Sequence, residues 1–320
     1  MVPHRLTFSS STGKFTLPFR VPQTWLDGVF YLYPDGRSAE ADELAGGCGF
    51  LLGWPIAEDS QDFLLFAVTN RHVVDQGSWT VRLNGKPSGL TCIETNDAEW
   101  IFAENSDLAI RPMALSQNQH RFNFITNTWL LDRAWYTALN IGPGDECLSI
   151  GRFVGHAGKN SNNPVVRFGQ ISQNPIEPVL MDGQPQECFL VESRSIGGYS
   201  GSPVFVHLDK EYYRDDINGR VAPDGTTLGR GRFPTGPFLL GVNCAMIKLW
   251  DRVCDASKQV LQTGFQVPMN TGMMAVVPAW HIIQLMEAPA VTALRREIEK
   301  GASVESVLKH GISPIRLTSS

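Results

Sequence analysis

Short apolar segments separated by clusters of turn residues make up most of the chain from Gly28 onward. Apolar runs of roughly four to eight residues, bounded by Gly, Pro, Asn and Asp, are typical of β-strands. The runs expected to be strands span 29–33, 48–54, 63–69, 79–83, 146–150, 165–168, 189–192, 204–206 and 238–243. The dipeptide Asn84-Gly85, which follows the fourth run, predicts a hairpin turn. The pattern as a whole predicts an all-β protein.

A helical pattern is found only near the end of the sequence. Pro278 begins a segment that continues to Glu287, and the next apolar residues, Val291, Leu294 and Ile298, recur at the i, i+3, i+7 spacing of one helix face. Short helices are therefore expected after the last strand, as an appendix to the β structure.

Two polar segments interrupt the strand pattern. Residues 116–135 begin with many Asn and Gln and are expected to connect two β units, and residues 207–236 are expected to form a surface insertion. The expected order along the chain is a lead over 1–27, one β unit over 28–130, a second over 131–278 and C-terminal helices over 279–320.

The composition agrees with a folded, turn-rich protein. Of the 320 residues 42% are hydrophobic and only 18% are charged, and 30 Gly and 20 Pro suit many short strands. The formal net charge is −5 and no Lys/Arg run occurs, so we expect no nucleic-acid partner and no membrane surface. The N-terminus lacks the pattern of a signal peptide, and no segment approaches the roughly 18 apolar residues that span a bilayer. A cytoplasmic location is expected.

The cysteines and histidines do not follow the spacing of a metal site. None of the six cysteines forms a C-x-x-C pair, no H-E-x-x-H occurs, and we expect neither a metal nor a cofactor. Most of the cysteines lie beside apolar, strand-like residues, which favours buried free thiols over disulfides. They are Cys48, Cys92, Cys147, Cys188, Cys244 and Cys254.

Three segments contain residues that could act together in catalysis. Ser200 lies within the glycine-rich stretch 197–203, where glycines allow two backbone N–H groups to point at one spot, as an oxyanion hole requires. His72 follows an apolar strand and Asp107 precedes one. Each residue alone is ordinary, since most such side chains cap or turn the chain. Together they indicate a nucleophile, a base and an acid that orients the base.

The segments Thr69-Asn-Arg-His72-Val-Val, Asp107-Leu-Ala and Gly198-Tyr-Ser-Gly-Ser-Pro resemble the signature segments of the trypsin-like serine peptidases, the bacterial-type intracellular members above all. The resemblance spans about residues 28 to 278. It implies the chymotrypsin fold, in which two six-stranded antiparallel β-barrels pack face to face, with His72 and Asp107 on the first barrel and Ser200 on the second.

The nucleophile segment departs from the family's usual pattern at two positions. Tyr199 stands where the family most often has Asp or Asn, and Ser202 replaces a glycine. The cysteines that usually flank this loop are also missing. Neither substitution removes a catalytic group, because residue 199 is expected to contribute mainly its backbone and Ser202 has a small side chain.

The activity that the resemblance implies is that of a serine endopeptidase acting on protein or peptide substrates. Ser200 would attack the scissile carbonyl, His72 would take and return the proton, and Asp107 would orient the imidazole. The backbone N–H groups of Gly198 and Ser200 would form the oxyanion hole.

Two further expectations concern the substrate. The segment Gly241, Val242 and Asn243 is expected to pair with the substrate backbone as an added strand and to form one wall of the P1 pocket. Arg194, six residues before the nucleophile, is expected either to lie at the base of that pocket and favour an acidic P1 residue, or to be a solvated surface residue.

Alternative functions differ in what they require of the same residues. An α/β-hydrolase elbow would need glycine at position 202 and the chain order Ser, Asp, His, and neither is met. A catalytically idle chymotrypsin-fold module that binds peptides, or a latent peptidase regulated by a partner protein at its termini, stays open.

Overall fold

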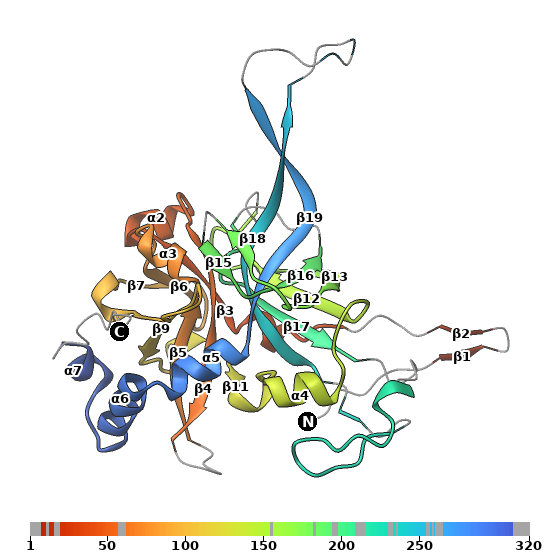
Figure 1. Cartoon of the computed structure of the whole chain (residues 1–320). Helices are drawn as coiled ribbons and strands as arrows, with labels where there is room; N and C mark the ends of the chain where they lie inside the picture. Colours follow the sequence, from red (N-terminus) through yellow and green to blue (C-terminus); the bar gives the residue numbers. More distant parts are fainter. Residues whose placement is uncertain are drawn as a thin grey trace.

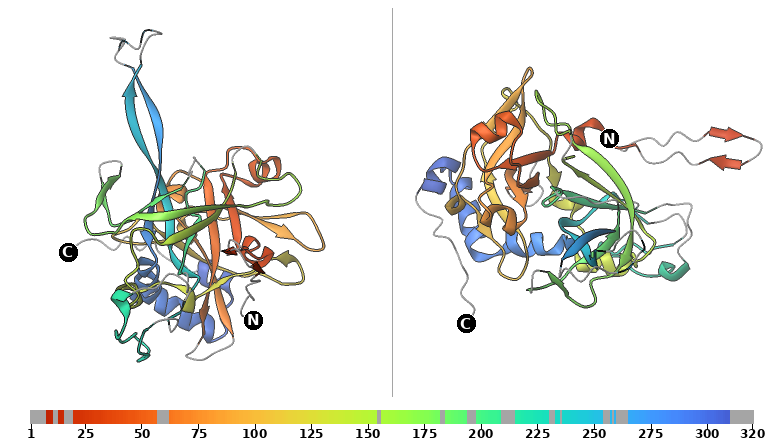
Figure 2. Two further views of the ribbon diagram at one scale, coloured as in Figure 1. Left: turned by 90° about the vertical axis from the view of Figure 1, so that its right-hand side faces the viewer. Right: turned by 90° about the horizontal axis from the view of Figure 1, so that it is seen from above.

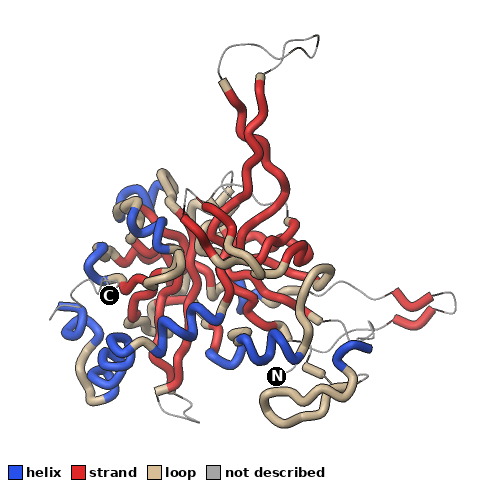
Figure 3. Tube along the Cα trace, viewed as in Figure 1, coloured by secondary structure: helices blue, strands red, loops and turns tan. Residues whose placement is uncertain are grey.

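The computed structural model describes residues 8–10, 13–15, 20–56, 62–153, 156–181, 184–193, 198–208, 215–229, 233–234, 236–253, 257, 259 and 265–309. Strands make up most of its body, and helices lie at the periphery (Figure 3). Two β units lie side by side, the first built from the strands between residues 29 and 126 and the second from those between 146 and 278 (Figure 1).

The first unit is a nine-stranded sheet with the order β10-β6-β3-β4-β5-β9-β8, to which β7 adds on β6 and β11 on β4. All its pairs are antiparallel except β11 with β4. The strands are β3 (Val29–Tyr33), β4 (Gly47–Pro55), β5 (Phe63–Thr69), β6 (Thr80–Gly85), β7 (Leu90–Ile93), β8 (Ile101–Phe102), β9 (Ala109–Met113), β10 (His120–Arg121) and β11 (Ile125–Thr126).

Both faces of this sheet are buried, which explains why its strands are continuous apolar runs instead of alternating ones. Phe30 and Leu51 pack on one face in a cluster with Trp100. Tyr31 and Phe50 pack on the other face in a cluster that also contains residues of the second unit.

The second unit is a closed barrel of six strands in the order β12-β13-β16-β19-β18-β17, every neighbouring pair antiparallel. Phe189, Val204, Leu240 and Val276 belong to its core cluster. The strands are β12 (Glu146–Gly151), β13 (Val165–Gln173), β16 (Phe189–Glu192), β17 (Pro203–His207), β18 (Phe238–Arg252) and β19 (Gln266–Pro278), and a separate hairpin contains β14 (Val179–Met181) and β15 (Gln184–Gln186).

The expected fold class is confirmed, with a difference in the first unit. The structure is mostly β with helices after the last strand, and the second unit is the expected six-stranded barrel. The first unit has nine strands instead of six, with the short strands β7, β10 and β11 added to β6 and β4, and its sheet is not closed into a barrel.

Two of the six barrel strands are much longer than the apolar pattern indicated. β18 continues to Arg252, beyond the expected end at residue 243, and pairs with β19 from Lys248↔Asn270 to Arg252↔Gln266. This paired extension, which we call the arm, rises out of the body in both side views (Figures 1 and 2). Polar residues interrupt the apolar pattern of the arm, so the pattern does not predict these strand extensions.

The helices are short. Val291 and Leu294, both on α6, are buried, as the i, i+3 spacing predicts. The helices are α1 (Gln23–Leu26), α2 (Gly36–Ala41), α3 (Arg71–Asp75), α4 (Arg133–Ala138), α5 (Trp280–Glu287), α6 (Pro289–Glu299) and α7 (Val304–Lys309), with 3-10 turns η1 (Asp97–Glu99), η2 (Asn127–Trp129) and η3 (Asp215–Ile217) and an N-terminal hairpin of β1 (Phe8–Ser10) and β2 (Gly13–Phe15).

Two local expectations are wrong. β6 runs through Asn84 and Gly85, and the turn lies at residues 86–89, where the Gly85 N–H donates to the Gly89 carbonyl. The insertion 207–236 is not only a surface segment, because Ile217 and Leu228 are buried in the core cluster of the second barrel.

A buried charged cluster joins the two units. Arg82 of β6 is fully buried and donates to Asp42 (3.2 Å) and to the Gly158 carbonyl of the second unit (2.5 Å). Arg152, also from the second unit, donates to the same Asp42 carboxylate at 3.3 Å. Arginines from both units therefore share one carboxylate, and removal of Asp42 would leave both buried guanidinium groups without this anionic partner.

Candidate active site

His72 lies in the first turn of α3, which begins two residues after β5 ends at Thr69. The ring Nδ1 is 2.6 Å from Asp107 Oδ2, and the His72 backbone N–H donates to Asp107 Oδ1 at 2.9 Å. Asn70 adds a bond from its side-chain amide to the Asp107 carbonyl, also 2.9 Å. With Nδ1–H donating to the carboxylate, the lone pair of the neutral ring lies on Nε2, where a base needs it.

Asp107 lies two residues before β9 and is held from both units. Its backbone N–H donates to Gln186 Oε1 of β15 at 2.9 Å, and Gln186 is buried. The sequence offered no signal for Gln186, because the contact joins residues 79 positions apart.

The loop that contains Ser200 is anchored to the first unit through its carbonyl groups. The Cys48 N–H donates to the Ser200 carbonyl (2.7 Å), and the Cys48 thiol lies 3.4 Å from the Gly198 carbonyl oxygen, which accepts from it. Burial raises the pKa of the Cys48 thiol to about 11, so the thiol stays a donor at neutral pH. Gly198 and Gly201 both have a φ of 87°, which favours glycine.

A hydrogen bond within the loop determines the direction of the Ser200 amide N–H. The Tyr199 carbonyl accepts from the Ser202 N–H at 3.0 Å. Because C=O and N–H point in opposite directions in a trans peptide, the Ser200 N–H is directed away from that bond. Within the residues that the structure describes, neither the Gly198 N–H nor the Ser200 N–H donates a hydrogen bond. Both are available to a ligand oxygen.

Ser200 lies close to the segment that contains His72. A Cβ built on Gly47 would be 2.9 Å from both the Ser200 carbonyl oxygen and a methyl group of Val73, the residue after His72. The Ser200 hydroxyl donates to the Cys244 carbonyl at the long distance of 3.5 Å. Among the described contacts no hydrogen bond joins Ser200 Oγ to His72 Nε2. Catalytic hydrogen bonds are often long before substrate binds.

Tyr199 contributes more than its backbone. Its side chain is buried, its hydroxyl accepts from Arg167 Nε at 2.7 Å, and the guanidinium carbon lies 4.8 Å from the ring centroid. Burial raises the pKa of Tyr199, while Arg167 lowers it. Arg167 of β13 thereby holds the residue next to the nucleophile. Sequence reasoning missed this contact, because nothing near Arg167 marks it.

His72, on α3, and Asp107, just before β9, therefore belong to the first unit, and Ser200 lies three residues before β17 of the closed barrel. The chain adopts the fold of the trypsin-like serine peptidases. No family model matches the sequence, and no curated protein matches it.

Solved structures of this chymotrypsin-fold class are similar to the chain at low identity. The MamO protease domain from Magnetospirillum magneticum in its apo form is 14% identical, with 82% of this chain and 96% of that one covered and a TM-score of 0.43. The HtrA-type protease AlgW with a decapeptide is 16% identical, with 84% and 53% covered and a TM-score of 0.37. The Rv3671c protease from M. tuberculosis in an inactive form is 14% identical, with 82% and 88% covered and a TM-score of 0.37.

The expected substrate-pairing segment Gly241 to Asn243 is wrong. Gly241 pairs with Val204 on one side and Pro278 on the other, and Val242 pairs in the same way with Pro203 and Val277. Their backbone groups are already used within the chymotrypsin-fold barrel.

Asn243 is occupied as well. Its N–H donates to the Ser202 carbonyl, and its own carbonyl accepts from the Gly201 N–H. From Ala245 onward, β19 is the only described strand that pairs with β18. The edge of β18 without a strand partner therefore begins beside Cys244, three residues later than expected. Arg194 lies outside the described residues, so its role in the P1 pocket stays a prediction.

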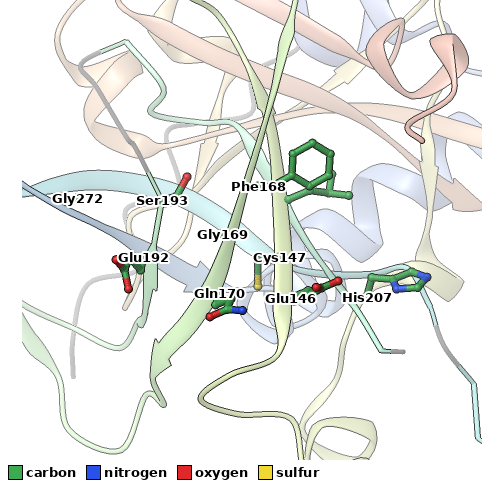
Figure 4. Close-up of a pocket in the computed structure, with 10 residues that line it drawn as sticks. Glu146, Cys147, Phe168, Gly169, Gln170, Glu192, Ser193, His207 and Gly272 are labelled. Atoms are coloured by element: carbon green, nitrogen blue, oxygen red, sulfur yellow. The ribbon is translucent and has the colours of Figure 1, made fainter. Parts of the chain in front are cut away.

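A cavity of about 590 Å³ lies on the barrel, and none of the three candidate catalytic residues lines it. His207, Glu146, Gln170 and Glu192 occupy paired positions on four adjacent strands. Figure 4 shows Glu146 and Glu192 on opposite sides of Gln170. No described group of three His, Cys, Asp or Glu side chains could hold a metal ion, and none of the described helices is long and apolar enough to cross a membrane.

Proposed function

We propose that the protein is a serine endopeptidase that cleaves peptide bonds in protein substrates through an acyl-enzyme. The observation that supports this best is the bond of 2.6 Å between His72 and Asp107, formed beside a loop in which Ser200 follows two glycines and a tyrosine. In such a site the carboxylate orients the imidazole, and the imidazole is the base that activates the serine nucleophile.

In the first step Ser200 Oγ turns from the Cys244 carbonyl toward His72 Nε2 and attacks the substrate carbonyl carbon. His72 takes the hydroxyl proton, and Asp107 stabilises the imidazolium that forms. His72 then protonates the leaving amine. A water molecule, deprotonated by His72, attacks the acyl group, and the returning proton restores the Ser200 hydroxyl.

The oxyanion that forms in each step is bound by two backbone groups. The Gly198 and Ser200 N–H groups, which have no described acceptor, would donate to it. Each such donor contributes roughly 3 kcal/mol in serine peptidases. Cys48 and the Tyr199–Arg167 pair keep the loop in the conformation that presents them.

A latent peptidase or an idle peptide-binding module is the second candidate. The bond from Ser200 Oγ to the Cys244 carbonyl favours it, because this rotamer points the hydroxyl at a backbone oxygen and not at the base. A regulatory partner at the termini would then have to turn the side chain. The cytoplasmic location expected from the sequence belongs to the same proposal.

Proteolysis of an unfolded protein, with cleavage sites mapped by mass spectrometry, tests the proposal. The wild type is expected to cut within the chain and Ser200→Ala to make no cuts. A P1 peptide library then tests Arg194: preference for small apolar or basic residues would contradict the acidic specificity. Equal cutting by wild type and Ser200→Ala would contradict the peptidase assignment.

A further inference from the structure

The arm exposes apolar side chains on both of its faces. Leu249 and Trp250 are each 57% exposed, and on β19 Val267 is 50% and Met269 44% exposed. Leu249 pairs with Met269, and Trp250 pairs with Pro268. Since paired residues share a face and successive residues alternate, one face presents Leu249 with Met269 and the other presents Trp250.

The arm is continuous with the candidate active site. β18 contains Cys244, whose carbonyl is 3.5 Å from Ser200 Oγ, and the same strand continues into the arm to Arg252. Leu249 and Trp250 are therefore five and six residues beyond the active site, roughly 17 to 20 Å along an extended strand. Over this distance β19 is the only described strand that pairs with β18. Bulges next to Asn243 and Met246 increase the local twist.

We propose that the arm is a second substrate-binding surface, which takes an extended polypeptide segment with adjacent apolar side chains on the N-terminal side of the cleaved bond. This inference rests on the proposed peptidase function and names its substrate class. A substrate strand that pairs antiparallel with β18 runs down the arm toward Ser200, so residues before the cleaved bond lie against the arm.

The distribution of apolar side chains fits an added strand. Such a strand places its side chains alternately on both faces of the ribbon, and each face of the arm has an apolar residue of β18 to receive them. A folded partner resting on one face would leave the other face exposed. The charged side chains of this part, Lys248, Asp251 and Arg252, include both signs, so they do not favour a strongly acidic or basic segment.

The substrate class follows from the length of this path. One strand residue for each residue of β18 places the apolar contacts roughly five to eight residues before the cleaved bond. The polypeptide must be extended over that whole length, roughly 25 Å. Unfolded chains and long unstructured termini offer such a segment, whereas compact folded domains rarely do.

Three fluorescent peptides with the same cleaved core test the inference. The first has no extension, and the second has an N-terminal extension of Ser and Gly that is eight residues long. In the third, positions five to eight before the cleaved bond are apolar residues chosen from Leu, Phe and Val. Affinity is measured by anisotropy with the Ser200→Ala protein, and kcat/KM with the active protein. The arm variant is Leu249→Ser with Trp250→Ser, and the control is Phe168→Ser, whose side chain is 58% exposed on the barrel.

We expect the apolar extension to increase both affinity and kcat/KM about tenfold, mainly through KM. The arm variant abolishes this preference, and Phe168→Ser retains it. Equal affinity of the wild-type arm for all three peptides would overturn the inference. An arm variant that loses the same affinity for all three peptides would also overturn it. So would an arm variant that changes from dimer to monomer in light scattering but retains the preference for the apolar peptide. Selective binding without cleavage would contradict the peptidase function alone.

Discussion

The carboxylate of Asp107 binds His72 twice, through Oδ2 to the ring Nδ1 at 2.6 Å and through Oδ1 to the backbone N–H at 2.9 Å. One carboxylate therefore fixes the position of α3 and the orientation of the ring. The side chains of both residues are partly exposed, His72 to 33% and Asp107 to 23%, so the pair lies at a surface that substrate can reach.

Replacement of Asp107 by Asn is expected to lower kcat by roughly four orders of magnitude. The amide cannot accept from both His72 N–H groups in the same way, and it favours the tautomer with the proton on Nε2. The measurement is kcat on a peptide substrate, with circular dichroism to confirm the fold. Activity within tenfold of the wild type would mean that Asp107 does not orient the base.

Removal of the Tyr199 hydroxyl tests the support of the oxyanion loop. In Tyr199→Phe the hydrogen bond from Arg167 Nε to the Tyr199 hydroxyl is lost, so the loop is held less firmly. We expect kcat to fall about tenfold or more with little change in KM. Arg121→Ala, which breaks a pair with Asp27 at 3.4 Å on the surface, is the control and should leave kcat unchanged. A rise in KM alone would contradict a role in the transition state.

Gly201 is expected to be irreplaceable. A Cβ at this position would collide with the Cys48 carbonyl, and the φ of 87° disfavours any side chain. Gly201→Ala should therefore lower the free energy of unfolding by about 3 kcal/mol or more and abolish activity. Gly77 has a φ of 86° and no atom within 4 Å of the built Cβ, so Gly77→Ala should cost about 1 kcal/mol. If urea denaturation gave the same loss of unfolding free energy for Gly201→Ala and Gly77→Ala, the collision with the Cys48 carbonyl would not be the cause.

Stability should fall at alkaline pH. Burial raises the pKa of the Cys48 and Cys188 thiols to about 11. In the unfolded chain these thiols lose protons near the ordinary pKa of about 8.5. Between these values the native state binds more protons, so the free energy of unfolding decreases as pH rises, by up to roughly 1.4 kcal/mol per pH unit for each thiol.

Urea denaturation at pH 8 and pH 10 measures this decrease. Cys188→Ala is expected to show a smaller decrease than the wild type, because one of the buried thiols with a raised pKa is removed. A free energy of unfolding that is the same at both pH values would show that the thiols are not buried as described.

The strands with strongly apolar sequences could be located from the sequence. β3, β5 and β16 have the expected bounds, since each is a continuous apolar run that ends at turn or polar residues. The three motif residues could also be singled out, because each lies next to an apolar strand in the sequence. The arm was missed, because exposed strands need no apolar pattern.

Contacts between the two units could not be predicted. The sequence predicts Cys48 to be a buried thiol at the start of a strand, and in the structure it also donates to the carbonyls of Gly198 and Ser200 from the other unit. The prediction of a substrate-pairing edge at Gly241 is wrong because the sequence alone does not show which strand edges are already paired. Both depend on residues far apart in the chain, for which local pattern contains no information.

The most direct test of the central claim is labelling of Ser200 by a fluorophosphonate probe, which reacts only with a serine activated by a base. The wild type is expected to label, with the modified peptide identified by mass spectrometry as the one containing Ser200. Labelling should disappear in Ser200→Ala and drop by orders of magnitude in His72→Ala. A folded wild type that does not label, or that labels equally in His72→Ala, would contradict the proposed nucleophile and base.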